Sequence, residues 1–250
     1  MSGHSKWASI KHKKAAADSK RGKVFTKIIR EIAVAARNAG GDPDMNPRLR
    51  KAIQDAKNGN MPADNIKRAI LKGTGQLEGA QYEEAIYEGY GPGGVAIYIT
   101  ALSDNKNRTV AELRHIFQKN GGQIGTQGCV AFRFKRGGYI DIDKDKAEEE
   151  KLMDIALNAG AEDIKDDGDT WEIVTTPEKF EAVLEAIKAA EIEIEDSNVG
   201  YIPEDYTKLE GKQAQQALKL VEELEDHDDV QTVAANFDID EKDIALYESA

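Results

Sequence analysis

The run Val95-Ala96-Ile97-Tyr98-Ile99-Thr100-Ala101-Leu102 is rich in β-branched and aromatic residues, which predicts a central strand. A glycine-rich turn over residues 91–94 separates it from another strand at residues 85–90. A helix is predicted over residues 107–121, and a third strand over Cys129–Phe134. Strands that alternate with a helix in this way are typical of an α+β domain.

A second pattern of the same class begins at Tyr139. Its predicted elements are, in order, a strand at residues 139–142, a helix around residues 152–156, strands near 163–165 and 170–174, a helix that opens at Pro177, and a strand near 192–194. This βαββαβ order is that of a ferredoxin-like domain.

The last two elements, a helix at 213–224 and a strand at 230–237, have no core of their own. Segment 84–135 lacks a closing helix and strand, so we expect these two elements to complete it. The predicted domains that follow are a discontinuous α+β domain of residues 79–136 plus 206–250, and an inserted ferredoxin-like domain of residues 137–205.

The N-terminal part of the chain predicts three short helices. The first starts near Lys20 and ends at Gly40-Gly41, the second begins at Asn46-Pro47, and the third runs from Pro62 to Gly73. Short loops between them favour a small bundle, within a first domain of residues 1–78. The predicted fold class is therefore α+β: an N-terminal three-helix bundle followed by two ferredoxin-like α+β domains, one inserted in the other.

Charge is distributed very unevenly along the chain. The formal net charge is -12, yet residues 1–78 carry a net charge of +10. Residues 137–205 carry -16 and residues 206–250 carry -8. A basic end on an acidic protein indicates a polyanionic partner, since the acidic part repels a polyanion and turns the basic end towards it.

The basic end consists of a polar leader and a helix. Residues 1–17 offer little apolar surface beyond Trp7 and Ile10, and the helix that follows places cations beside its apolar stripe. A solubilising tail is the alternative interpretation. The residues predicted to contact nucleic acid here are Lys6, Trp7, Lys11, Lys13, Lys14, Lys20, Arg21, Lys23, Lys27 and Arg30, joined by Arg48, Arg50 and Lys51 of the second helix.

A further contact is predicted where a strand ends and a helix begins, after Leu102. Lys106 and Arg108 lie in the first helical turn, where the helix dipole disfavours cations. A bound phosphate would offset that cost. The alternative is an ordinary ion pair between Arg108 and Glu112, one turn further along.

Several function classes are disfavoured. The only cysteine, Cys129, excludes an internal disulfide and a cysteine-based zinc site. The histidines His4, His12, His115 and His227 form no pattern typical of a catalytic or metal site, so we expect no enzyme activity, no cofactor and no metal. No apolar run approaches the length of a membrane helix, and the N-terminus lacks the apolar core of a signal peptide, so we expect a cytoplasmic protein without a membrane partner.

Several motifs spread along the chain stand out: Met1-Ser2-Gly3-His4-Ser5-Lys6-Trp7, Lys11-His12-Lys13-Lys14, Asp18-Ser19-Lys20-Arg21, Asn60-Met61-Pro62, Gly89-Tyr90-Gly91-Pro92-Gly93-Gly94 and Asn107-Arg108-Thr109-Val110-Ala111. Together they resemble the YebC family over nearly the full length. The resemblance implies three domains and a role in gene expression, because bacterial members are described as probable DNA-binding transcriptional regulators. It equally implies the alternative of a translation factor on the ribosome, the role of the mitochondrial branch.

The residues alone leave the partner open. A helical bundle is compatible with DNA binding, but no helix presents a cluster for base readout at its N-terminus. A lysine-rich leader with one tryptophan suits ribosomal RNA or unpaired bases. A third alternative is an acidic adaptor that binds basic proteins through residues 141–172 and 222–229. We favour a monomer that binds nucleic acid.

Overall fold

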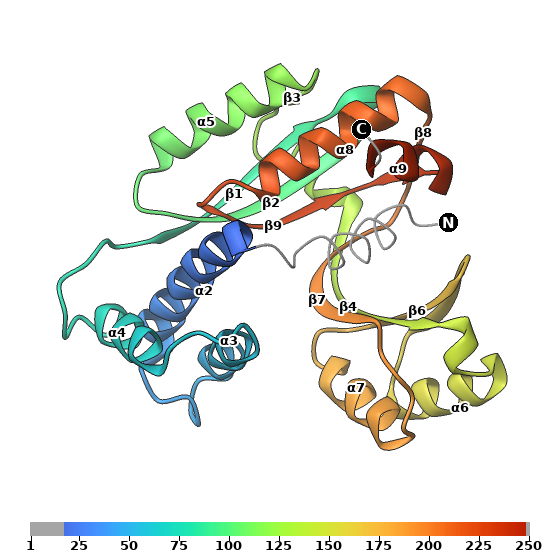
Figure 1. Ribbon diagram of the computed structural model, residues 1–250, viewed down its shortest axis with the longest axis horizontal. Coiled ribbons are helices and arrows are strands. Elements are labelled where there is room, and N and C mark those ends of the chain that lie inside the picture. The colour runs from blue at the N-terminus through green and yellow to red at the C-terminus, as the bar shows by residue number, and fades with distance from the viewer. Residues whose placement is uncertain (1–17, 249–250) are drawn as a thin grey trace.

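The computed structural model describes residues 18–248 of the chain. Figure 1 shows three lobes: helices α2–α4, a sheet covered by α5 and α8, and a second sheet covered by α6 and α7. A helical N-terminal part followed by α+β layers confirms the predicted fold class.

The helical lobe contains α2 (Asp18–Ala39), α3 (Pro47–Asn58) and α4 (Ala63–Gly73). Buried Asn46 fixes the turn between the first two, because its Oδ1 accepts the N–H of Leu49 at 3.1 Å and caps α3. Its Nδ2 donates to the carbonyls of Ala35 and Gly40, both at 2.8 Å. One side chain therefore satisfies backbone groups at the end of one helix and the start of the next.

Helix α4 approaches α2 closely at Gly73. A Cβ built on Gly73 would lie 2.3 Å from the carbonyl oxygen of Ala33 and 2.8 Å from the Cβ of Ala36. Both neighbours belong to the buried C-terminal part of α2, where the helix backbone cannot shift without disturbing the core. Glycine at this position is therefore what allows the two helices to pack at this distance.

We expect Gly73→Ala to lower the free energy of unfolding by about 1–3 kcal/mol, because the added methyl group forces the two helices apart. Urea unfolding measures the loss. The matched control is Gly22→Ala in α2, where a Cβ meets nothing within 4 Å. That substitution should be neutral or slightly stabilising, because alanine favours the helix by about 1 kcal/mol. Equal effects at both positions would contradict the packing explanation.

The first sheet has the strand order β3-β1-β2-β9 and is antiparallel at every pair. Its strands are β1 (Glu83–Tyr90), β2 (Ala96–Ser103), β3 (Gln123–Ile124) and β9 (Val230–Ala235). Helices α5 (Lys106–Lys119) and α8 (Gly211–Glu225) cover one face (Figure 1). Strand β2 is buried along nearly its whole length, as predicted for a central strand.

The second sheet has the order β5-β6-β4-β7, which is that of a ferredoxin-like βαββαβ unit. Its strands are β4 (Phe134–Asp143), β5 (Asp163–Asp167), β6 (Thr170–Thr175) and β7 (Asp196–Pro203), and its helices are α6 (Glu149–Ala159) and α7 (Phe180–Ala189). The smaller elements are the 3-10 turns η1 (Pro92–Gly94), η2 (Ala131–Arg133) and η3 (Lys144–Lys146), strands β8 (Thr207–Leu209) and β10 (Phe237–Ile239), and helix α9 (Glu241–Glu248).

Two predicted strands are wrong. Residues 129–133 form a loop and the turn η2, because the side chain of buried Glu88 accepts backbone N–H groups that a ladder would need. Residues 192–194 are irregular, and the strand begins only at Asp196. The sequence also missed the parallel pair β8–β10 and helix α9. Strand β9 pairs with β2, although the whole second sheet lies between them in the sequence, and the predicted domain boundaries stay a prediction.

Candidate nucleic-acid interface

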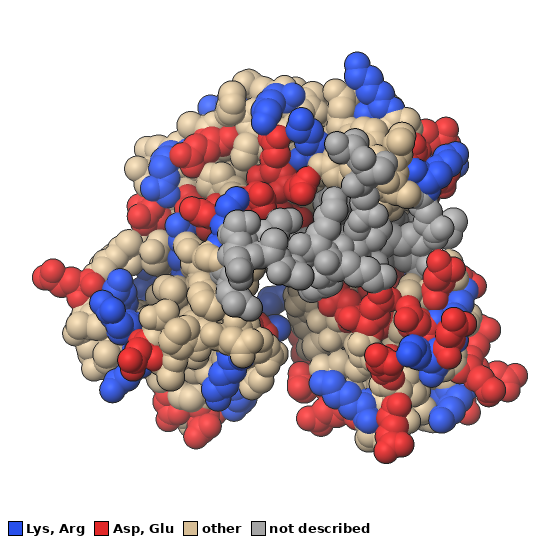
Figure 2. Space-filling view, in the orientation of Figure 1, with Lys and Arg blue, Asp and Glu red and all other residues tan. Residues whose placement is uncertain are grey.

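The cations of the described residues fall into two groups: those that pair with carboxylates of the protein and those that do not. On the face seen in Figure 2, acidic side chains crowd the lobe of α6 and α7, whereas the lobe of α3 and α4 shows more basic and uncharged surface. Because a nucleic acid needs cations that are not already neutralised, we expect an interface where cations of the second group lie on a lobe with few carboxylates.

Part of the predicted interface lies outside the described residues, namely Lys6, Trp7, Lys11, Lys13 and Lys14. Lys20 and Arg21 belong to α2, and their side chains lie outside the described part as well.

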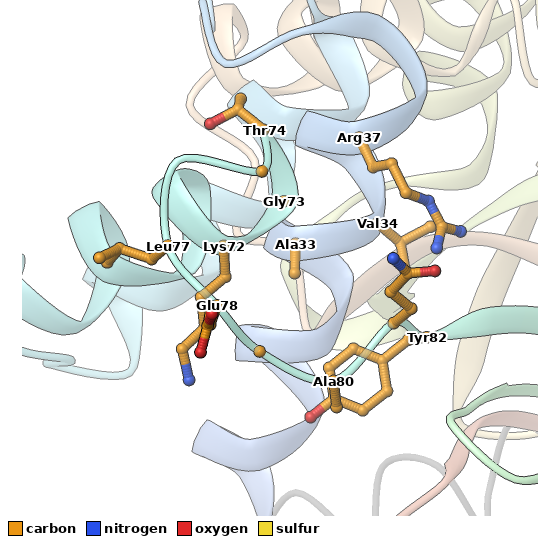
Figure 3. Close-up of a pocket in the computed structure, with 13 residues that line it drawn as sticks. Ala33, Val34, Arg37, Lys72, Gly73, Thr74, Leu77, Glu78, Ala80 and Tyr82 are labelled. Atoms are coloured by element: carbon orange, nitrogen blue, oxygen red, sulfur yellow. The ribbon is translucent and has the colours of Figure 1, made fainter.

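Two basic side chains that were not predicted as nucleic-acid contacts line a cavity of about 820 Å³ between α2, α4 and the segment that leads to β1. Arg37 comes from the last turn of α2 and Lys72 from the last turn of α4 (Figure 3). Glu78 and Tyr82 line it too. Among the carboxylates whose side chains the structure describes, none lies within the 4.0 Å ion-pair distance of Arg37 or Lys72. The same holds for Arg68, one helical turn before Lys72.

These three cations, Arg37, Arg68 and Lys72, are called the unpaired patch below. Nothing in the sequence distinguishes them from the paired cations by residue type. Position gives only a partial signal: Arg37 and Lys72 stand in the last turns of their helices, where carbonyl groups favour cations, but so does Lys119 of α5, which pairs with Glu223.

The predicted cations of α3 are engaged within the protein. Arg48 pairs with Glu31 at 2.5 Å and with Glu84 of β1. Hydrogen bonding to Glu31 is the largest cause of a strong rise in the pKa of Arg48. Lys51 pairs with Asp55 at 3.4 Å, and the guanidinium of Arg50 donates to a backbone carbonyl, that of Asp44. These side chains stay partly exposed, but each must break an ion pair or hydrogen bond within the protein before it can contact a phosphate.

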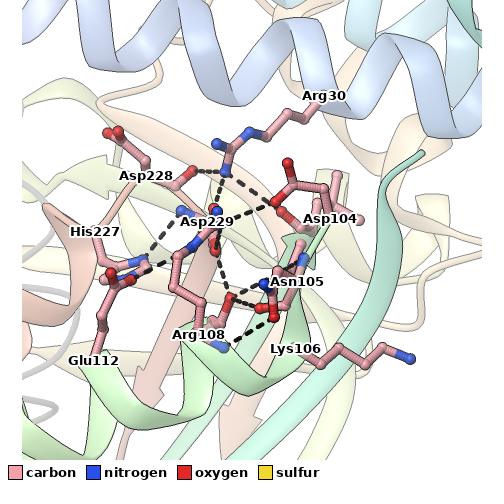
Figure 4. A network of polar contacts seen from close by, with 12 residues as sticks. Arg30, Asp104, Asn105, Lys106, Arg108, Glu112, His227, Asp228 and Asp229 are labelled. Atoms are coloured by element: carbon pink, nitrogen blue, oxygen red, sulfur yellow. Dashed lines mark hydrogen bonds and ion pairs between the residues drawn. The ribbon is translucent and has the colours of Figure 1, made fainter. Parts of the chain in front are cut away.

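The most extensive polar network joins α2 to the sheet through Asp229, whose side chain is 2% exposed (Figure 4). Arg30 of α2 donates to Asp229 Oδ1 at 2.5 Å, and Arg108 of α5 donates to Oδ2 at 2.8 Å. The hydroxyl of Thr109 also donates to Oδ2, at 2.5 Å. A single buried carboxylate thus holds an arginine from each of two helices, and it anchors the helical lobe to the start of β9.

Burial alone would raise the pKa of Asp229, but hydrogen bonds from Thr109 and Arg108 and the charge of Arg30 outweigh it and hold the pKa at about 2. An unperturbed aspartate titrates at 3.8, so the carboxylate contributes its full stability above about pH 4 and loses it as the pH falls towards 2. We expect about 2 kcal/mol of unfolding free energy to disappear over this range. Urea titrations from pH 5 to pH 2 measure it, and Asp229→Asn should lack that part of the pH dependence.

The predicted cations of α2 face an acidic segment, residues 225–229, at the end of α8 and just after it. Lys23 pairs with Asp226 at 3.3 Å, and the Lys27 ammonium donates to the carbonyl of Glu225. Arg30 also donates to the carbonyl of Asp228 at 2.6 Å. The side of α2 that the sequence predicted as an outer basic face therefore contacts carboxylates and carbonyls from the far end of the chain.

The helix start at Lys106 and Arg108 receives its anions from the protein itself. Lys106 pairs with Glu83 at 2.7 Å, and Arg108 pairs with Asp104 at 2.9 Å as well as with Asp229. The alternative partner Glu112 lies further away, at 3.9 Å. These carboxylates offset the unfavourable dipole, and the predicted phosphate contact at this helix start stays a prediction.

His227 completes the network and shows why its acidic surroundings are a poor metal site. Its Nδ1 accepts the N–H of Asp229 at 3.1 Å, so Nε2 carries the proton that points to Glu112 at 2.9 Å. The side chains of Glu112, His227 and Asp229 could each offer one ligand atom. A metal there would have to displace two guanidinium groups from Asp229, which opposes binding.

None of the helices within residues 18–248 combines the length and apolar character that crossing a bilayer requires.

Comparison with known proteins covers almost the whole chain. A family model described as the TACO1/YebC protein N-terminal domain matches residues 5–76. A second model, described as the TACO1/YebC second and third domain, matches residues 82–237.

Individual relatives agree with the family models. A probable transcriptional regulatory protein of Solibacter usitatus is 56% identical over 244 residues, 98% of either chain. One of Natranaerobius thermophilus is 59% identical, covering 96% of this chain and 98% of that one. The crystal structure of a conserved hypothetical protein from Aquifex aeolicus is similar with a TM-score of 0.78 at 47% identity, covering 90% of this chain and 93% of that one.

Proposed function

Because the chain belongs to the TACO1/YebC family, we propose that it is a non-enzymatic regulator of gene expression that works by binding nucleic acid. The relatives are named probable transcriptional regulatory proteins, which makes regulation of transcription through DNA the first candidate. The observation that carries the proposal is the unpaired patch on the helical lobe, in the part of the chain that has a net charge of +10.

An RNA target, and with it a role in translation, is the second candidate. The pairing of Arg48 with Glu31 and Glu84, and of Lys51 with Asp55, supports it. Reading bases in the DNA major groove needs a helix with free donors, and α3 has few of them. Backbone contacts and unpaired bases, by contrast, need only cations and aromatic rings.

We expect the double substitution Arg68→Glu and Lys72→Glu to weaken nucleic-acid binding at 0.1 M salt, by on the order of tenfold for each phosphate that is no longer neutralised. Fluorescence anisotropy from 50 to 300 mM salt, with a duplex DNA and a hairpin RNA as probes, measures affinity and salt slope together. The slope should flatten by roughly 0.7–0.9 for each of those phosphates. The probe that binds more tightly indicates which of the two candidates holds.

The matched control is the double substitution Lys151→Glu and Lys188→Glu, which makes a comparable charge change on exposed residues of α6 and α7. It should leave both affinity and slope nearly unchanged. If both double substitutions weaken nucleic-acid binding equally, only the total charge of the protein matters and the unpaired patch is no interface. If wild-type protein binds neither probe at 50 mM salt, the proposed function is wrong.

A further inference from the structure

Phe132 is the most exposed aromatic side chain of the described residues, 69% exposed at the middle of the turn η2. The residues two positions before and after it are buried. Val130 is fully buried and Phe134 is 8% exposed, and both pack into the core cluster with Ala96 and Tyr98. The chain therefore inserts the side chains on either side of Phe132 and leaves this ring in solvent.

The turn that presents Phe132 is held by a buried carboxylate. Glu88 of β1, 4% exposed, accepts the N–H of Gly128 at 2.6 Å and those of Val130 and Ala131 at 2.8 Å each. The N–H of Arg133 donates to the carbonyl of Val130 at 2.9 Å. Three charge-assisted bonds to one carboxylate, with this turn bond, fix the backbone on both sides of the ring, so its position is set before any ligand arrives.

The stretch of sequence that contains Phe132 is basic. Residues 113–140 contain five Lys or Arg and no Asp or Glu, although residues 79–250 as a whole carry a net charge of -22. The guanidinium carbon of Arg133 lies 5.8 Å from the centroid of the Phe132 ring, and Arg136 is exposed four residues further on. Arg133 also pairs with Asp205 at 3.3 Å, and Lys135 with Glu162 at 3.0 Å.

We propose that Phe132 is a stacking platform for an unpaired base of a single-stranded nucleic acid, and that the exposed Arg136, four residues further along the chain, contacts a neighbouring phosphate. An exposed, rigid aromatic ring next to cations is the arrangement that single-strand binders use, because every base offers a π-face. The inference rests on the proposed function and deepens it: the platform lies outside the helical lobe and adds selectivity for unpaired over paired strands.

Phe132→Ala should weaken binding of a 12-nucleotide oligouridylate by about 5- to 100-fold, the range for loss of one stacked base. Binding of a duplex of equal length should stay unchanged, because its bases are already stacked. Phe132→Trp should retain single-strand affinity. In a Trp7→Phe background, which removes the other tryptophan expected to stack, the emission of the new tryptophan should be quenched by the oligouridylate and not by the duplex. Leu157→Ala, which removes another exposed apolar side chain on α6, should change nothing.

The outcomes separate this inference from the proposed function. If wild-type protein binds the oligouridylate and Phe132→Ala binds it equally well, the platform is wrong while nucleic-acid binding stands, and a protein partner becomes the explanation for the exposed ring. If Phe132→Ala loses affinity for the duplex and for the single strand equally, the stacking role of Phe132 is wrong as well. If wild-type protein binds neither probe, both proposals fail together.

Discussion

Asp229→Asn is expected to lower the free energy of unfolding by about 3 kcal/mol, because it leaves the guanidinium of Arg30 largely buried without its counter-charge. The substitution keeps the size of the side chain and one hydrogen-bond acceptor, so the loss reports on charge and not on volume. Arg108 is 41% exposed and can turn to water or to Asp104. Most of the effect therefore comes from the link between α2 and the start of β9.

Urea unfolding followed by circular dichroism measures this loss, and the chain offers a close control. Asp226→Asn removes the carboxylate that pairs with Lys23, but both side chains of that pair are about half exposed. A solvated pair contributes about 0–1 kcal/mol, so the control should unfold almost as the wild type does. A loss of similar size in both variants would mean that Asp229 acts as an ordinary surface charge and does not anchor the helical lobe.

The elements that could be predicted from the sequence are those decided by neighbouring residues. Asn46 followed by Pro47 predicted the start of α3, and the structure shows the cap that this pair implies. The β-branched run at 95–102 predicted a central strand, and β2 has a paired strand on each side. In both places the local preference and the tertiary packing favour the same conformation.

The parts that could not be predicted depend on distant partners. The apolar alternation of residues 129–134 fits a strand, but Glu88, some forty positions earlier, accepts N–H groups that a ladder would need. The basic residues of α2 fit a free outer face, but the acidic segment 225–229 lies against them. A sequence pattern records residue types, whereas the choice between a free and a paired cation is made by the fold.

Removing residues 1–17, which leaves α2 complete, should weaken nucleic-acid binding more than any single substitution in the helical lobe. The deletion takes away Lys6, Lys11, Lys13 and Lys14, which lie outside the described residues. At about 0.1 M salt, each phosphate left without its lysine lowers the affinity by on the order of tenfold, so four of them would amount to several orders of magnitude. The log–log salt slope should flatten by roughly 3.6 for duplex DNA, about 0.9 for each of the four phosphates.

A full-length variant in which these four lysines are replaced by glutamine separates charge from chain length and from Trp7. Because counterion release depends on charge alone, it should reproduce most of the loss on duplex DNA. For single-stranded RNA, the deletion variant should have a lower affinity than the glutamine variant, because it also loses the stacking of Trp7 on a base. The melting temperature should stay the same in both, since residues 1–17 offer only Trp7 and Ile10 as large apolar side chains besides Met1. If the deletion variant binds as tightly as wild type at 50 and 200 mM salt, residues 1–17 are a solubilising tail, and the interface is confined to the unpaired patch.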